Sequence, residues 1–161
     1  MRYSTEIEIL SHVFEHHCSY DELLLPSKQR ELFDKLQVEG FHKDTIAKAF
    51  VWFSSFAHHQ KKKKSHPQKN SIRLFSADEI NKIGDENLQF IRTLEHVGVV
   101  DATMREFIIN QLMRLEHNKI AILDVKWVTF LLLSGSIYGK QKDIGERIEL
   151  FSLVMSDDHH C

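Results

Sequence analysis

The chain has 161 residues, of which 42% are hydrophobic and 27% charged, and its net charge is −2. A chain of this length forms about one domain and buries roughly 70% of its unfolded surface, so its core needs no disulfides or metals. With only 6 glycines, 2 prolines and 2 cysteines, the composition excludes a disordered, collagen-like or disulfide-rich protein.

The cysteine content and the apolar stretches indicate the compartment. Cys18 and Cys161 are too few for a disulfide framework, which is typical of a reducing environment. The N-terminus has no long apolar run, and the longest apolar stretch, 127–133, is far shorter than the roughly 18 residues that span a bilayer. We therefore expect a cytoplasmic protein.

The first third of the chain predicts three helices, because apolar residues recur there at helical spacing. Thr5 and Glu8 match a capping box, Ser27 can cap the second helix, and Gly40 can end it. Residues 20–26 are expected to be a connection, since a proline disfavours helical backbone in the residue before it. The three helices are predicted over 5–17, from Ser27 to Gly40, and over 43–58.

A basic segment follows the third predicted helix. Residues 58–73 contain no acidic residue and six basic ones: Lys61, Lys62, Lys63, Lys64, Lys69 and Arg73. Without these six, 15 basic residues remain against 23 acidic ones, a balance of −8. Such a run is typical of a solvated linker and, as the alternative, of an arm that contacts a polyanion.

The second half of the chain predicts further helices. Ser76 and Glu79 match a capping box, Gly84 can end that short helix, and Asp85 and Asp101 can cap the next two. The run 122–133 is apolar almost all round, and its length and leucine content favour a central buried helix over a strand. We predict an all-α protein with two small helical modules, packed as an orthogonal bundle: residues 1–58 and 72–155, joined by a basic linker at 59–71 and followed by a tail at 156–161.

A histidine-rich pattern in the first helix raises the question of metal binding. His12, Glu15 and His16 match H-x-x-E-H, in which two histidines four positions apart share a zinc ion and the glutamate acts as a base. A catalytic site also needs a third ligand and a cleft, and neither is visible near this short terminal helix. Surface binding by His12, His16, His17 and Cys18 is an alternative, but we assign no metal ligand and no cofactor.

Three other features of the sequence are candidates for a functional role. Four adjacent lysines can contact phosphates but cannot recognise particular bases, so nucleic-acid binding through them would be non-specific and salt-sensitive. Trp52 and Phe56 widen the apolar face of the third helix, where they either face a partner or pack against the second module. Asp124 and Lys126 lie in the most apolar helix beside Trp127. We expect each charge to reach the rim of the helix or to pair with a residue such as Arg105 or Glu106, which is a structural role.

Several segments together resemble the bacterial Smg family, DUF494. They extend over about residues 7–153 and comprise Ile9-Leu10 with Val13-Phe14-Glu15, Val38-Glu39-Gly40-Phe41, Ile46, Ala49, Trp52, Ser71 to Ser76 with Glu79, Phe90 to Val100, Arg105-Glu106 and Leu123-Asp124-Val125-Lys126-Trp127-Val128. The resemblance implies an all-helical bacterial protein without an assigned activity, and it supplies no catalytic residues. It also implies that His12 and His16 are peculiar to this sequence.

The sequence thus favours a non-enzymatic helical interaction or adaptor protein with an unknown protein partner. It contains no P-loop, G-x-G-x-x-G, G-x-S-x-G or C-x-x-C motif, so we assign no catalytic residue. The alternative is a nucleic-acid- or ribosome-associated factor that uses the basic linker. A metal-dependent hydrolase built on the histidine pattern is a third hypothesis.

Overall fold

The computed structural model describes residues 5–61, 73–134 and 144–157, and all regular structure within these ranges is α-helical. The predicted all-α class is therefore confirmed. The chain divides into two compact units, Met1–Lys62 (unit 1) and Lys63–Cys161 (unit 2), and each is described by itself. Within the described ranges, no helix combines the length and the apolar character that crossing a membrane requires.

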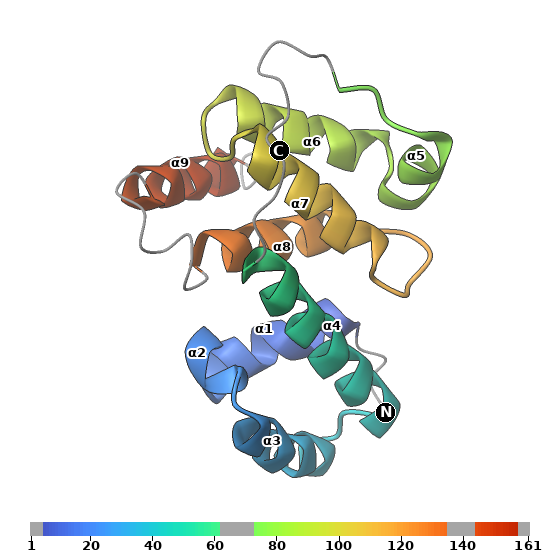
Figure 1. Ribbon diagram of the computed structural model, residues 1–161, viewed down its shortest axis with the longest axis vertical. Coiled ribbons are helices and arrows are strands. Elements are labelled where there is room, and N and C mark those ends of the chain that lie inside the picture. Colours follow the sequence, from blue (N-terminus) through green and yellow to red (C-terminus); the bar gives the residue numbers. More distant parts are fainter. Residues whose placement is uncertain (1–4, 62–72, 135–143, 158–161) are drawn as a thin grey trace. The chain divides into compact units, whose positions relative to one another are not determined.

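Unit 1 is built around its longest helix, which packs against two others. Its helices are α1 (Glu6–His16), α2 (Tyr20–Leu23), α3 (Pro26–Val38) and α4 (Lys43–Lys61). Helix α4 contacts both α1 and α3 (Figure 1). Val13, Leu36 and Phe53 are fully buried in this core, and Phe53 also contacts the rings of Phe14 and Tyr20.

Local signals fix most helix ends in unit 1. The Thr5 hydroxyl accepts a hydrogen bond from the Glu8 amide at 3.2 Å, as expected for the N-cap of α1. The expected connection at 20–26 is wrong in part, because Ser19 and Glu22 form a capping box that starts the short helix α2. Helix α3 begins with Pro26 at its first turn rather than with a cap from Ser27, since the proline's fixed φ suits that position.

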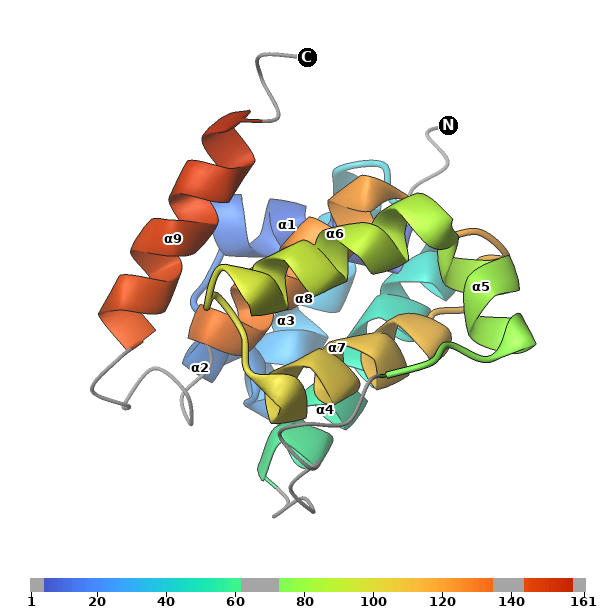
Figure 2. The same cartoon turned by 90° about the horizontal axis from the view of Figure 1, so that it is seen from above.

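The apolar run of unit 2 forms a helix that contacts three others, but it is not buried all round as predicted, because Leu123 and Phe130 are exposed. Its helices are α5 (Ala77–Ile83), α6 (Asp85–His96), α7 (Ala102–Met113), α8 (Ile122–Ser134) and α9 (Ile144–Asp157). Helix α8 contacts α6, α7 and α9 (Figure 2). Phe107 and Ile108 of α7 and Val125 and Val128 of α8 are buried in this core.

Capping residues set the helix starts in unit 2. Ser76 and Glu79 form the predicted capping box at α5, and the Asp101 side chain accepts a hydrogen bond from the Met104 amide at 2.8 Å. The predicted cap at Asp85 is wrong, because Gly84 occupies the N-cap position of α6 with a φ of +89°. Only glycine adopts this backbone conformation readily, so Gly84 both ends α5 and starts α6.

Candidate functional site

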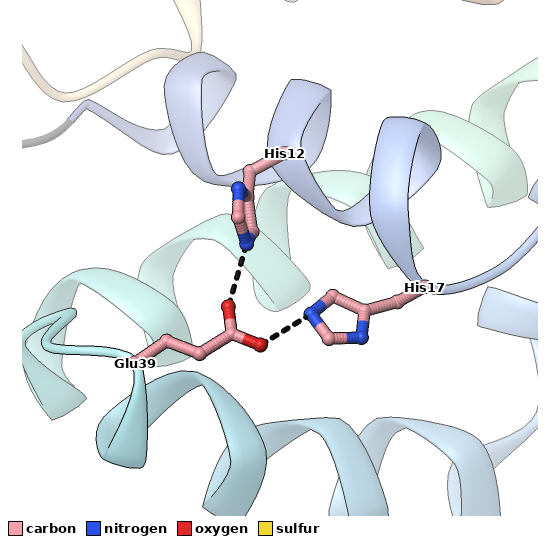
Figure 3. A group of neighbouring side chains, drawn as sticks. All are labelled: His12, His17 and Glu39. Carbon is pink, nitrogen blue, oxygen red and sulfur yellow. Dashed lines mark hydrogen bonds and ion pairs between the residues drawn. The ribbon is translucent and has the colours of Figure 1, made fainter.

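Two histidines and one glutamate converge in unit 1. The Nε2 atom of His12 donates a hydrogen bond to Oε2 of Glu39 at 2.6 Å, and Nε2 of His17 lies 2.8 Å from Oε1 of the same carboxylate. Potential ligand atoms of the three residues all lie within 4.8 Å of one another. Figure 3 shows the Glu39 carboxylate between the two imidazole rings.

Helix ends bring these residues together. His12 lies within α1, His17 is the C-cap of α1, and Glu39 is the C-cap of α3. Gly40 follows with a φ of +104°, which reverses the chain directly after Glu39. Phe41 then packs against the His12 ring, with 5.0 Å between the ring centroids. The ends of two helices thus hold the carboxylate beside both imidazoles.

The electrostatics of the cluster favour an ionised carboxylate. Burial raises the pKa of Glu39, but the hydrogen bond from His12 and the charge of His17 outweigh it, so the pKa lies below its usual value of 4.5. The Nε2 atom of His17 is buried and makes no hydrogen bond of proper geometry, although the carboxylate oxygen is close. The cluster therefore contains one well-formed hydrogen bond and one buried nitrogen that lies close to the carboxylate without a hydrogen bond.

The H-x-x-E-H pattern does not assemble as its spacing suggests. His16 is exposed, and its Nε2 atom is 3.9 Å from the carboxylate of Glu15, the residue next to it. Cys18 does not belong to the cluster, and burial, followed by the charge of Glu22, raises the pKa of its thiol. The centroid of the His16 ring lies 4.7 Å from that of the His12 ring, but of the four residues only His12 and His17 form a group of potential ligands with Glu39.

Arg73 belongs to an ion-pair network inside unit 2. Its guanidinium donates to both oxygens of Glu79, at 3.1 and 2.7 Å, and its Nε donates to Glu106 at 2.9 Å. Arg105 pairs with Glu95 and also with Glu106. Two carboxylates thus already engage the charge of Arg73, which argues against the polyanion contact expected for it. Lys61 ends α4, while Lys62, Lys63, Lys64 and Lys69 lie outside the described residues.

Asp124 has a different partner from the one expected. Its carboxylate accepts hydrogen bonds from the Ala121 amide and from Nε2 of His117, both at 2.9 Å. The expected link to Arg105 or Glu106 is wrong, because those two residues belong to the Arg73 network. Asp124 thus caps the first turn of α8 and holds the preceding loop against it. The residue is buried, with 4% of its surface exposed.

The face of α8 that carries Lys126 and Trp127 borders an apolar groove. The groove has a volume of about 180 Å³ and is lined by Leu123, Lys126, Trp127, Phe130, Phe151 and Met155. Helices α8 and α9 supply these residues. Leu123 and Phe130 are 46% and 40% exposed, and the Phe130 ring packs edge-on against Trp127 at 5.7 Å. The groove therefore presents large apolar side chains to solvent.

The predicted partner-facing pair of unit 1 does not form such a surface. Trp52 is 5% exposed and Phe56 is fully buried, with 5.3 Å between their ring centroids. The expectation that these residues face a partner is therefore wrong, and their apolar character serves packing. Phe56 also contacts the ring of Tyr20, which belongs to the short helix that the sequence did not predict.

A larger, polar pocket lies at the junction of α5 and α6. It has a volume of about 550 Å³ and includes Lys82 and Asn87 in its lining. The Lys82 ammonium donates to the carbonyls of Met113 and Leu115, and the Asn87 amide donates to those of Ile83 and Ile120. These side chains hold the 114–120 loop in place, which is a structural use of the polar groups in this pocket.

The described ranges thus define an all-α protein with a histidine–glutamate cluster in unit 1 and an apolar groove in unit 2. The chain belongs to the family described as "Protein of unknown function (DUF494)", which matches residues 7–158. Proteins named "Protein Smg homolog" are similar to it. The one from Coxiella burnetii (strain Dugway 5J108-111) is 28% identical over 98% of this chain and 96% of its own length.

Further relatives with the same name come from Shewanella. The proteins of Shewanella woodyi and Shewanella baltica (strain OS155) are 30% and 32% identical, and each alignment covers 85% of this chain and 92% of the relative. The resemblance to the Smg family is therefore confirmed. No solved structure matches the chain.

Proposed function

We propose that the chain is a non-enzymatic interaction protein of the bacterial cytoplasm, which binds a helix of a partner protein in the groove between α8 and α9. The observation that carries this proposal is the exposure of Phe130 and Leu123 beside Trp127. Large apolar side chains gathered at one surface site are a common feature of protein-interaction surfaces. Aromatic residues, tryptophan above all, supply much of the binding energy at such surfaces.

The size of the groove supports a protein partner over a small-molecule substrate. Sites for small ligands usually have volumes of about 300–1,000 Å³, whereas this groove has about 180 Å³. That space suits one or two anchoring side chains. Because the groove lies between two helices, an amphipathic helix can lay its apolar face along it and insert such anchors at helical spacing.

A photo-crosslinking amino acid placed at Phe130 tests the proposal in the native bacterium. We expect a discrete crosslinked protein that survives nuclease treatment and disappears when Trp127→Ala is added. The matched control places the crosslinker at Val38, an exposed apolar position on α3 of unit 1. Equal products at both positions, or loss of the product with nuclease, would contradict binding of a protein in the groove.

The second candidate function, association with a nucleic acid or the ribosome, is supported by the charge of the basic segment. Lys61, Lys62, Lys63, Lys64 and Lys69 lie in a stretch without acidic residues. Binding through such charges releases counterions, so it weakens steeply with salt. A gel-shift series with RNA and DNA, repeated with Lys61 to Lys64 changed to Gln, separates the two functions. An unchanged shift in that variant would remove the second candidate.

A further inference from the structure

We propose that His12, His17 and Glu39 form a binding site for a divalent transition-metal ion such as Zn²⁺. The site lies in unit 1, so it does not depend on the groove proposed above. Two imidazoles and one carboxylate are a ligand set that zinc accepts, with a fourth position left for water. Imidazole nitrogens also accept iron(II), nickel and copper, whereas oxygen ligands alone would favour magnesium or calcium.

The distances place the ligand atoms close to what an ion requires. Bonds of about 2.0–2.2 Å in a tetrahedral site separate the ligand atoms by roughly 3.3 Å. The two nitrogen–oxygen distances are 2.6 and 2.8 Å, and potential ligand atoms of the three residues all lie within 4.8 Å of one another. Changes of about 0.5–1.5 Å in these separations would therefore bring the ligand atoms to the spacing that the ion needs.

The Nε2 atom of His17 gives an independent reason to expect a ligand. This atom is buried, lies beside a carboxylate and makes no hydrogen bond of proper geometry. A buried polar atom of this kind is unusual, because protein interiors normally pair such groups. A metal ion between His17 and Glu39 would satisfy the nitrogen and balance the charge of the carboxylate.

The ion would compete with protons for the same atoms. Nε2 of His12 makes a hydrogen bond to Glu39, and metal binding requires a ring nitrogen that carries no proton. Since His12 and His17 belong to α1 and Glu39 to α3, a bound ion would hold the C-terminal ends of these helices together.

Zinc titration of the full-length, untagged protein against a chromophoric chelator tests the site. His159 and His160 are changed to Ala and Cys161 to Ser in every sample, so that the tail cannot bind the metal. We expect one equivalent of Zn²⁺ and a raised melting midpoint. Loss of a residue that only supports a metal ligand commonly costs about 10–100-fold in affinity. Loss of a direct ligand should cost at least as much, so His12→Ala, His17→Ala and Glu39→Gln should each weaken binding at least about tenfold.

His16→Ala is the matched control, because His16 lies on the same helix and is exposed. Its affinity for Zn²⁺ should equal that of the reference protein. Circular dichroism checks that each variant is folded. If a histidine variant unfolds, Glu39→Gln still tests the site, because glutamine has nearly the size of glutamate. Binding of less than one equivalent, unchanged binding in folded Glu39→Gln, or an equal loss in His16→Ala would overturn the proposal.

Discussion

Arg73 and Glu106 lie side by side although 33 positions separate them in the chain, with Nε of Arg73 2.9 Å from Oε2 of Glu106. The same guanidinium binds both oxygens of Glu79, which completes the capping box of α5. One side chain thus joins the segment before α5 both to the start of that helix and to α7. A residue predicted to contact a polyanion instead has an internal structural role.

Replacement of this arginine should destabilise unit 2. Arg73→Gln leaves the partly buried carboxylates of Glu79 and Glu106 without their shared cation, and we expect the free energy of unfolding to fall by about 2 kcal/mol. All proteins in this comparison carry Trp52→Phe, which leaves Trp127 as the single tryptophan. Its fluorescence during urea unfolding therefore reports on unit 2. The control is Arg30→Gln on α3, an exposed position where the change should stay within about 0.5 kcal/mol. Equal effects of the two substitutions would contradict the role of Arg73.

The same network predicts a loss of stability in acid. Hydrogen bonds from Arg73 and Ser76 outweigh burial and lower the pKa of Glu79 below 4.5. A carboxyl with a lower pKa in the folded than in the unfolded chain stabilises the fold above pH 4.5, and this contribution disappears as the pH falls through the folded value. Glu79→Gln should therefore reduce the fall in unfolding free energy between about pH 5 and pH 3. An unchanged fall in Glu79→Gln would contradict this role of the network.

The sequence predicts most of the fold because its helix signals are local. The Ser76 capping box, the Asp101 cap and the apolar run of α8 each lie within a few residues of the structure that they specify. The short helix α2 carried such a signal too, since Ser19 and Glu22 have the spacing of a capping box. Pro26 led to the prediction of a connection over 20–26, because a proline disfavours helical backbone before it. A proline also fits the first turn of a new helix, and it starts α3 in this way.

The candidate sites were harder to predict because they join distant positions. His12 and His17 were visible as metal-binding residue types, but Glu39 follows His17 by 22 positions and has no spacing signal. The sequence also favoured His16, whose separation from His12 matches one helical turn. The His117–Asp124 pair was missed for a similar reason, since a loop outside the helical period supplies the histidine.

The His117–Asp124 pair should contribute to the stability of unit 2. Asp124→Ala removes the acceptor for both the Ala121 amide and His117, so we expect a loss of about 2 kcal/mol. Asp124→Asn should cost less, because its amide oxygen can still accept from the backbone. A double-mutant cycle with His117→Ala isolates the pair, and we expect a coupling of about 1 kcal/mol. Strictly additive losses would show that His117 and Asp124 do not interact.

Phe130 and Phe107 should respond differently to truncation, because one borders the groove and the other fills the core. Phe107 is 1% exposed, so Phe107→Ala should lower the free energy of unfolding by about 3–5 kcal/mol. Phe130 is 40% exposed, and removing its ring should cost roughly 1 kcal/mol, which includes the contact with Trp127. Urea unfolding followed by Trp127 fluorescence measures both losses. If Phe130→Ala proves as costly as Phe107→Ala, the ring stabilises the fold itself and a partner-binding role for the groove loses its main support. A small loss means that stability alone does not account for a phenylalanine at this exposed site.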